Sequence, residues 1–397
     1  MEYETPMQVA ERLSVTVRAV QKWAAAGKLK GAKKVGRDWL IPKGLPDPRL
    51  ADAKESVGDD VSEDKFHIVL PLMNGAFQPG KSLEYINSLT DEDDRNIAMG
   101  EYYYYSGQAE KSVHIMEPYL SSKDASLKYS AETTLIFANI SLGRINLARY
   151  AFTEMSNQNK KLFASDSSIE EIALGVMSEH ALAVLLHQPC SDDLPELEPY
   201  IKYLPKAMKI WACYIVAYRA YQENNYEKAL GIADVALALS IEEYPVTMTY
   251  CKLVGIMSLL AMMRIKEAKE RFNELWQYTK ADGFVEIIGE HYGFLQGVVD
   301  TSMKKSDPQT YELLMKTVRS FGVNWIKLYN QISERSVADN LSATEFTVAM
   351  LYNKGWSAQE IATHLSLSEH TVRGYIKTIY VKLGISDKKA LSQFMLR

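Results

Sequence analysis

The most constraining feature of the sequence is a pair of short predicted helices near the C-terminus, joined by a polar turn. Ser357 and Glu360 form a capping box, in which each side chain can satisfy a backbone amide of the other, so a helix is predicted to begin at residue 358. The turn Ser366-Leu367-Ser368 follows, and Ser368 can cap a second helix that Gly384 ends. The spacing predicts two helices that meet at a sharp angle.

The second of these helices has one apolar face and one basic face. Its apolar stripe consists of Val372, Tyr375, Ile376, Ile379 and Leu383. Its opposite face carries His370, Arg373, Gly374, Lys377 and Lys382. A DNA major groove requires basic groups on an open helix face, because Arg can form paired hydrogen bonds to guanine and Lys neutralises phosphate. The alternative is an amphipathic helical hairpin whose basic face is merely solvated.

The flanking sequence favours the DNA-binding interpretation. Ser342 and Glu345 form a second capping box, which opens a helix that ends at Gly355. Ser386 can cap a last helix that carries Leu391, Phe394 and Met395. Residues 341–397 are therefore predicted to form four helices. They resemble the LuxR-type DNA-binding domain, with matches at LSATE, EIA, LSLSEHTVR and KLGIS.

The LuxR resemblance implies roles for individual residues. It implies that Arg373, Gly374 and Lys377 face the bases and that Thr371 and Lys382 lie near phosphates. It also implies that the last helix pairs two subunits, so we expect a homodimer. Gly374 stands in place of a side chain and Thr378 stands where the family often has asparagine, so no base preference is transferred.

The charge is unevenly distributed along the 397 residues, which carry a formal net charge of −5. Residues 1–45 have nine Lys or Arg and four Asp or Glu, a charge of +5, and residues 341–397 have seven and four, a charge of +3. The remaining residues carry −13. Two basic ends flank an acidic middle, which predicts nucleic-acid contact at the ends and contact with a partner or signal in the middle.

A small module is also predicted at the N-terminus. Thr5, Pro6 and Gln8 combine a cap, a proline at the first helical position and a capping-box partner, so a helix is predicted from Pro6 to about Arg12. Thr16 can cap a second helix that ends at Gly27. Its inner residues are Val17, Val20 and Trp23, and its outer residues are Arg18, Gln21 and Lys22. Residues 32–35 and 39–41 are predicted to form a hairpin around Gly36-Arg37-Asp38.

This N-terminal pattern resembles the winged helix-turn-helix of MerR regulators and phage excisionases, at VAERLSVT, AVQKW, GKL and VGRDWLIP. The resemblance implies that Arg18, Gln21 and Lys22 enter a groove beside the capping Thr16, while Arg37 on the wing reaches the backbone or the minor groove. The alternative is a protein-docking module with solvated basic residues. A phosphate loop is excluded at Gly31-AKKV-Gly36, because Arg37-Asp38 replaces the required Lys-Ser or Lys-Thr.

The middle of the chain begins with a linker and continues as repeated helix pairs. Residues 46–65 are acidic, rich in helix breakers and without apolar periodicity. Four similar turn sequences follow, SGQAEKS, LGRINLA, NNYEKAL and MRIKEAK, and two of the steps between them are 36 and 39 residues. Alanines after these turns, Ala109, Ala148, Ala229 and Ala268, suit close helix packing. The pattern resembles tetratricopeptide repeats, which imply a concave surface for a peptide, protein or small ligand.

The sequence offers little support for catalysis, membrane insertion or a metal site. It contains no HExxH, GxSxG or complete phosphate loop, and the histidines lack metal-ligand spacing. His180 and His187, two turns apart on one predicted helix face, are interpreted as structural, as are most of Tyr102 to Tyr105. No apolar run is long enough to cross a membrane, and the three cysteines are scattered, so we expect a cytoplasmic protein with free thiols.

The predicted fold is mainly α, with a tetratricopeptide-like α-solenoid between a small winged helix-turn-helix and a four-helix LuxR-type helix-turn-helix domain. The predicted parts are residues 1–45, the linker 46–65, the body 66–335 and the DNA-binding domain 336–397. The predicted function is a sequence-specific transcriptional regulator of double-stranded DNA, without cofactor or enzymatic activity, whose body senses a ligand or docks a partner. The alternatives are a repeat scaffold or a recombination accessory protein, whose terminal modules bind proteins or shape DNA.

Overall fold

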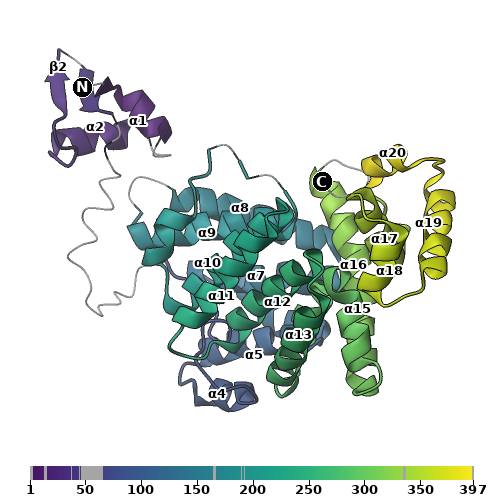
Figure 1. The fold of residues 1–397 in the computed structure, drawn as a ribbon. Coiled ribbons are helices and arrows are strands. Elements are labelled where there is room, and N and C mark those ends of the chain that lie inside the picture. The colour runs from purple at the N-terminus through teal and green to yellow at the C-terminus, as the bar shows by residue number, and fades with distance from the viewer. Residues whose placement is uncertain are drawn as a thin grey trace.

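The computed structural model describes residues 3–12, 16–36, 38–43, 45, 66–163, 167–188, 190–191, 193–333 and 337–395. Helices dominate these residues, and both ends of the chain carry helix-turn-helix modules, so the mainly α prediction is confirmed (Figure 1). The predicted linker, residues 46–65, lies outside the described residues, as do Arg37 and Leu13. In the described part of the chain, no helix combines the length and apolar character needed to cross a membrane.

The N-terminal module is built from two helices and a small sheet. Its helices are α1 (Pro6–Arg12) and α2 (Val17–Ala25), and its strands are β1 (Tyr3–Glu4), β2 (Lys33–Val35) and β3 (Asp38–Pro42). The strands are antiparallel in the order β1-β3-β2, with Lys34 opposite Trp39. The core is formed by Val9, Ala10, Ala19, Val20, Trp23, Ala24, Leu29 and Ile41.

Two details of this module differ from the sequence-based expectations. Strand β1 was not expected, because two residues are too short to show an alternating pattern; it forms by pairing with the end of β3. Val17 was expected to face inward, yet its side chain is 40% exposed. Val17 is the first residue of α2, and the helix turns its inner face toward the core only from Ala19 and Val20 onward.

The middle of the chain is a stack of helices. They are α4 (Ser82–Ser88), α5 (Glu92–Tyr105), α6 (Ala109–Met116), α7 (Ala125–Ser141), α8 (Ile145–Leu162), α9 (Ile169–Leu185), α10 (Lys206–Gln222), α11 (Tyr226–Leu239), α12 (Pro245–Ala261), α13 (Ile265–Lys280), α14 (Glu286–Glu290), α15 (Tyr292–Met303) and α16 (Pro308–Ser333). Two short 3₁₀ helices, Glu117–Ser121 and Glu198–Tyr203, follow α6 and precede α10.

The four turn sequences coincide with tight connections inside helix pairs. The pairs α5/α6, α7/α8, α10/α11 and α12/α13 each turn at one residue with positive φ: Gly107, Gly143, Asn224 and Met263 respectively. The alanine after each turn is at most 5% exposed, as the packing argument requires. The helix-pair architecture therefore follows from local turn chemistry, while the tetratricopeptide resemblance stays a prediction.

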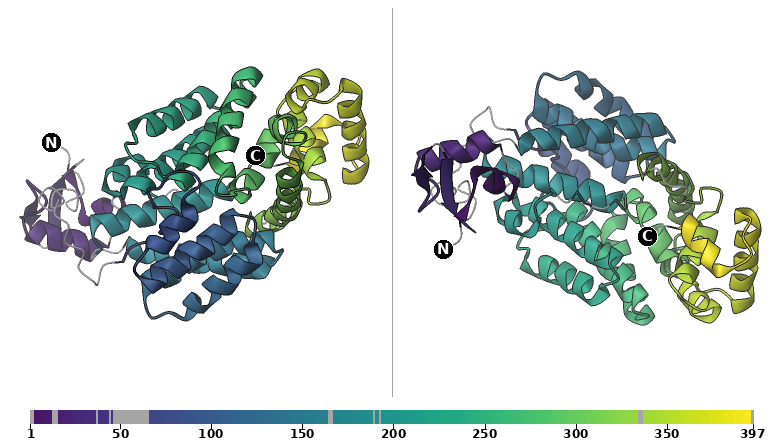
Figure 2. Two further views of the ribbon diagram at one scale, coloured as in Figure 1. Left: turned by 90° about the horizontal axis from the view of Figure 1, so that it is seen from below. Right: turned by 90° about the horizontal axis from the view of Figure 1, so that it is seen from above.

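The last helices of the body return to contact the first ones. Helix α14 packs against α5, and α16 packs against α7 and α8. Buried hydrogen bonds join these distant segments: Ser141 Oγ donates to Glu286 Oε1 at 2.5 Å, and the Tyr104 hydroxyl donates to Glu290. Figure 2 shows α5 to α9 on one side and α10 to α13 on the other, with the later helices at one end of the body. The body is therefore more closed than a simple concave stack.

The C-terminal part consists of α17 (Ala343–Asn353), α18 (Ala358–Leu365), α19 (Glu369–Leu383) and the short α20 (Lys388–Leu391), which continues as a 3₁₀ turn, Ser392–Phe394. Both predicted capping boxes are present. The predicted cap of the last helix is wrong, because the Asp387 carboxylate, and not Ser386, accepts the hydrogen bond from the Ala390 amide, at 2.9 Å. The α-helix there is only one turn long, although Leu391 and Met395 are buried as expected.

Several predicted structural residues take part in the core of the body. Tyr104 and Tyr105 are buried, whereas Tyr102 and Tyr103 are half-buried. All three cysteines are free, and Cys251 is fully buried. The expectation that His180 and His187 share one helix face is wrong: α9 ends at Leu185, and His187 follows in the left-handed region with φ of 50°.

Candidate nucleic-acid interface

Helices α18 and α19 are held at a defined angle by their caps and the turn between them. Ser357 and Glu360 cap α18 reciprocally, with hydrogen bonds of 2.7 and 3.2 Å. Ser366 ends α18 in the left-handed conformation, and the Ser368 hydroxyl accepts from the Thr371 amide at 3.0 Å to begin α19. Gly384 ends α19 with φ of 62°. These bonds make the orientation of α19 a property of the local sequence.

The inner face of α19 anchors it to the C-terminal core. Val372 and Ile379 are fully buried, while Tyr375, Ile376 and Leu383 are partly buried against the same cluster. The other side of α19 is exposed, and it carries Thr371, Arg373, Gly374, Lys377 and Thr378. The predicted apolar and basic faces are present, except that Lys382, predicted on the basic face, pairs with α17 instead.

The charged residues of α19 differ in how they are held. Arg373 forms an ion pair with Glu369 one turn earlier, with its Nη2 2.6 Å from Glu369 Oε1, and it remains 68% exposed. Among the described residues, no ion partner holds Lys377. Gly374 follows Arg373 in the chain, and a Cβ there would meet no atom within 4 Å. Arg373 and Lys377 therefore lie one turn apart on the exposed face, with bare backbone at Gly374 beside them.

Lys382 points away from this group. Its Nζ lies 2.7 Å from Glu345 Oε2, in the capping box of α17, where the Glu345 side chain is 8% exposed. The Lys382 ammonium therefore contributes first to packing α19 on α17. A role near phosphate, as the resemblance implies, requires the ammonium to be shared between Glu345 and the phosphate.

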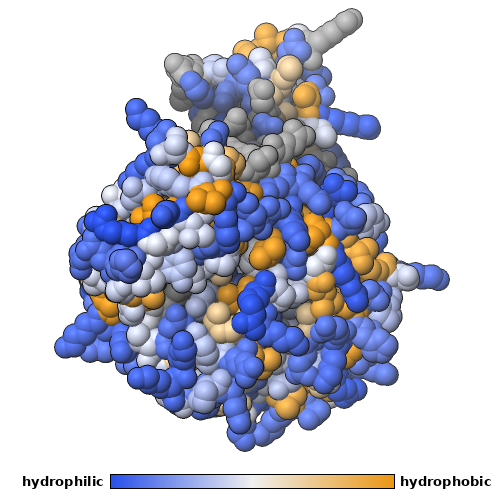
Figure 3. Space-filling model, turned by 90° about the vertical axis from the view of Figure 1, so that its right-hand side faces the viewer, coloured by the Kyte–Doolittle hydropathy of each residue, from blue (hydrophilic) through white to orange (hydrophobic). Residues whose placement is uncertain are grey.

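Helix α19 lies on the outside of the molecule. It packs on α17 and α18, whereas the body reaches this part through α15 and α16 (Figure 1). On the side of the molecule where α19 lies, hydrophilic side chains predominate, with smaller hydrophobic patches between them (Figure 3). The body leaves the exposed face of α19 accessible.

The N-terminal module presents a similar arrangement. The Thr16 hydroxyl accepts from the Ala19 amide at 3.2 Å, so its main role here is to cap α2. Arg18, Gln21 and Lys22 are exposed along α2, as predicted. Strand β2 adds the exposed Lys33 and Lys34. They were not among the predicted DNA contacts, although the sequence of the hairpin is basic.

Two segments of the chain match known domain families. Residues 339–395 match the model of bacterial regulatory proteins of the luxR family, and residues 5–44 match a helix-turn-helix domain model. The chain carries a LuxR-family helix-turn-helix domain at its C-terminal end. No curated protein and no solved structure matches the chain. The LuxR-family domain and the N-terminal helix-turn-helix make the protein a DNA-binding regulator.

The LuxR-family domain is docked on α15 of the body. The Thr347 hydroxyl of α17 donates to the Gly293 carbonyl oxygen at 3.0 Å. One turn further along α15, Gly297 lies against the backbone of His364 and Leu365 at the end of α18, so closely that no side chain fits. Asn330 of α16 forms two hydrogen bonds with Val337, at 2.8 and 2.9 Å. Sequence patterns could not indicate this junction, because it joins residues far apart in the chain.

No group of three or more His, Cys, Asp or Glu that could hold a metal ion occurs among the described residues. His180 is buried and its Nε2 lies 2.7 Å from the Pro195 carbonyl oxygen. His291 is also buried; its Nδ1 lies 2.8 Å from the Ile287 carbonyl oxygen and its Nε2 2.8 Å from the Tyr214 hydroxyl. The other ring nitrogen of His180, Nδ1, lies 3.4 Å from Cys190 Sγ and also contacts the Arg219 guanidinium.

Proposed function

We propose that this protein is a sequence-specific transcriptional regulator that reads double-stranded DNA with α19 and senses a ligand or partner with its helical body. The observation that carries the proposal is the outward, basic face of α19, held by caps at both ends in a segment that matches the luxR family. We propose its parts to be residues 1–45, 46–65, 66–335 and 336–397. The protein would act in the cytoplasm and without enzymatic activity, as its sequence composition and motifs indicate, and as a homodimer, as the family resemblance implies.

Within α19 we assign different roles to the two exposed cations. Arg373, oriented by Glu369, would form hydrogen bonds to a guanine edge. Lys377, without an ion partner among the described residues, would neutralise phosphate or approach a base as a point charge. Gly374 would allow close approach of the backbone, and Thr371 and Lys382 would lie near phosphates. In the N-terminal module, Arg18, Gln21, Lys22 and Arg37 would contact a second site, with Thr16 at the start of α2.

The test begins with selection of bound DNA from a random pool by the full-length protein. On the selected sequence, Arg373→Ala should cost about 1–3 kcal/mol and relax preference at one base pair. Lys377→Ala should weaken binding to all sequences evenly and reduce the dependence of affinity on salt. Thr363→Ala, on the exposed side of α18, serves as a control. Unchanged affinity of both Arg373→Ala and Lys377→Ala for the selected DNA would refute the DNA-reading role of α19. DNA binding that does not depend on salt would favour the alternative of a protein scaffold.

A further inference from the structure

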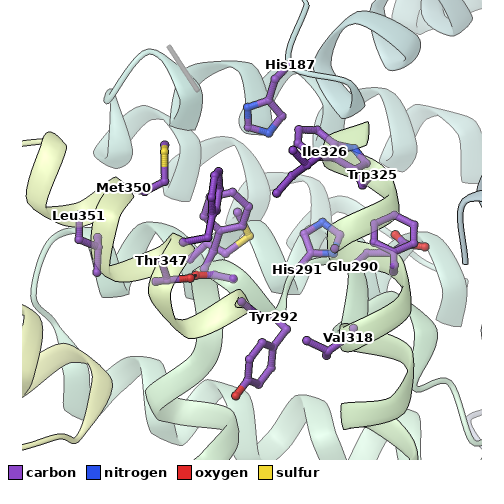
Figure 4. A pocket seen from close by; sticks show the side chains of 18 of the residues that line it. His187, Glu290, His291, Tyr292, Val318, Trp325, Ile326, Thr347, Met350 and Leu351 are labelled. Carbon is purple, nitrogen blue, oxygen red and sulfur yellow. The ribbon is translucent and has the colours of Figure 1, made fainter. Parts of the chain in front are cut away.

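A cavity of about 470 Å³ lies at the junction of the body and the LuxR-family domain. Its walls come mainly from the body helices α10, α12, α14, α15 and α16, from the turn after α9, and from α17 and α18 of the LuxR-family domain. Figure 4 shows Met350 and Leu351 of α17 on one side of the space, Trp325 and Ile326 of α16 on the other, and His187 directed toward it. The cavity is thus complete only when the two parts are docked.

Aromatic and aliphatic side chains form most of the lining. Tyr218, Tyr221 and Phe294 come from the body, and Phe346 comes from α17. The His187 ring stacks on Phe294, with 6.3 Å between centroids and 5° between planes, and meets Trp325 edge-on at 5.3 Å. The volume falls within the range of small-molecule sites, which are mostly apolar with a few placed polar groups.

Several polar groups of the lining are buried and hydrogen-bonded to residues behind the cavity wall. The Glu290 carboxylate accepts hydrogen bonds from the Tyr104 and Tyr250 hydroxyls. The three lining histidines, His187, His291 and His364, have pKa values that burial lowers to about 4, so they are neutral at neutral pH. Arg319 and Lys354 are the remaining charged residues of the lining, and both are exposed, but the Lys354 ammonium lies 5.7 Å from the centroid of the Tyr221 ring, and burial lowers its pKa. The interior therefore offers hydrogen bonds and ring surfaces, and its charged groups lie toward the exposed side, where Lys354 is already paired with the Tyr221 ring and Asn224.

One lining atom lacks a partner. His364, on α18, is 5% exposed, and its Nδ1 has no hydrogen bond among the described residues. A buried polar atom without a partner is costly, and such atoms in native proteins call for an explanation. His187 adds a second unusual feature, because a non-glycine residue with φ of 50° holds its ring over the cavity.

We propose that this cavity binds an uncharged, ring-containing small molecule of mostly apolar character, with one hydrogen-bonding group that reaches His364. A charged ligand would lose its water without meeting a buried counter-charge. The inference deepens the proposed regulator function and rests on it for its purpose, since the ligand would contact both the sensing body and the DNA-binding domain. Ligand affinity and docking of the LuxR-family domain are then linked, and each must change the other.

The site can be tested with the neutral fluorescent probe N-phenyl-1-naphthylamine and the full-length protein. Gly322 lines the cavity and Gly231 is exposed on α11; at both, a built Cβ meets no atom within 4 Å. We expect saturable binding of one probe per chain by the wild type and by Gly231→Phe. Gly322→Phe should weaken that binding at least tenfold. Absence of saturable binding by the wild type, or equal affinity of the two variants, would overturn the proposal.

A second comparison tests the charge of the ligand without any substitution. The anionic probe 8-anilinonaphthalene-1-sulfonate has the same ring system with an added sulfonate, and we expect it to bind at least tenfold more weakly. The reverse order would overturn the assignment of an uncharged ligand. DNA binding is measured separately: Arg373→Ala should reduce it and leave probe binding unchanged. Failure of the cavity and failure of DNA reading therefore give different results.

Discussion

Gly297 offers the sharpest test of how the body holds the LuxR-family domain. A Cβ at this position would lie 2.9 Å from both the Cα and the carbonyl carbon of Leu365, and closer still to the carbonyl oxygen of His364. All three are backbone atoms that cannot rotate away. Ordinary contact begins at 3.4 Å, so relieving the two Leu365 contacts requires α15 and α18 to separate by about 0.5 Å, and the closer His364 carbonyl oxygen requires more.

The size of the effect follows from this clash. Overpacking of this kind costs about 1–3 kcal/mol. Replacing a helical glycine with alanine stabilises the helix by about 0.5–1 kcal/mol. Gly293→Ala is the matched control on the same helix: its Cβ would lie 3.7 Å from Thr347 Oγ1, which is ordinary contact. Both variants gain about the same helix stability from alanine, so this gain largely cancels between them. The free energy of docking α15 on α18 should therefore be about 1–3 kcal/mol less favourable in Gly297→Ala than in Gly293→Ala.

Hydrogen–deuterium exchange with mass spectrometry measures this difference directly. Amides of α15 and α18 should exchange about 5- to 150-fold faster in Gly297→Ala than in Gly293→Ala, if opening of the junction controls exchange. Gly297→Ala should also bind N-phenyl-1-naphthylamine more weakly while retaining the selected DNA sequence, because α19 does not face the body. Equal exchange in both variants would refute the close backbone packing at this junction.

Two further predictions concern charge. Burial raises the pKa of Glu101 and Glu290 to about 8 and of Glu286 to about 7, so above the ordinary value near 4.5 the folded state holds protons that the unfolded state has released. The free energy of unfolding should therefore fall as pH rises from 6.5 to 8, by up to about 1.4 kcal/mol per pH unit for each group. In Glu290→Gln, the free energy of unfolding measured with urea should fall less steeply with pH than in the wild type. Below pH 6.5 the buried histidines oppose this trend, because their pKa values near 4 in the folded state leave the unfolded state with more bound protons. Lys382→Met, which leaves Glu345 unpaired, should reduce stability by about 0.5–1 kcal/mol in urea unfolding, whereas Lys377→Met should not; equal losses would contradict the pairing of Lys382 with Glu345.

The sequence alone was sufficient to predict the structural features that depend on hydrogen bonds between residues close together in the chain. The capping boxes at Ser342 and Ser357, the stop at Gly384 and the two faces of α19 depend on hydrogen bonds between residues three or four positions apart. The helix pairs of the body depend in the same way on one left-handed residue per turn. Such local chemistry is visible as a pattern, and it also determined the mainly α class.

Tertiary structure decided the features that depend on distant residues. The pairing of Tyr104 with Glu290 spans 186 positions, and the bond from Thr347 to Gly293 spans 54. The cap at Asp387 was local but ambiguous, because the neighbouring Ser386 is an equally good cap residue, and the left-handed turn at His187 was missed. Apolar and tyrosine-rich helices can pack against many partners, so their periodicity does not specify which surfaces meet. Only the packing of α15 and α16 against α17 and α18 brings residues from both parts around one cavity.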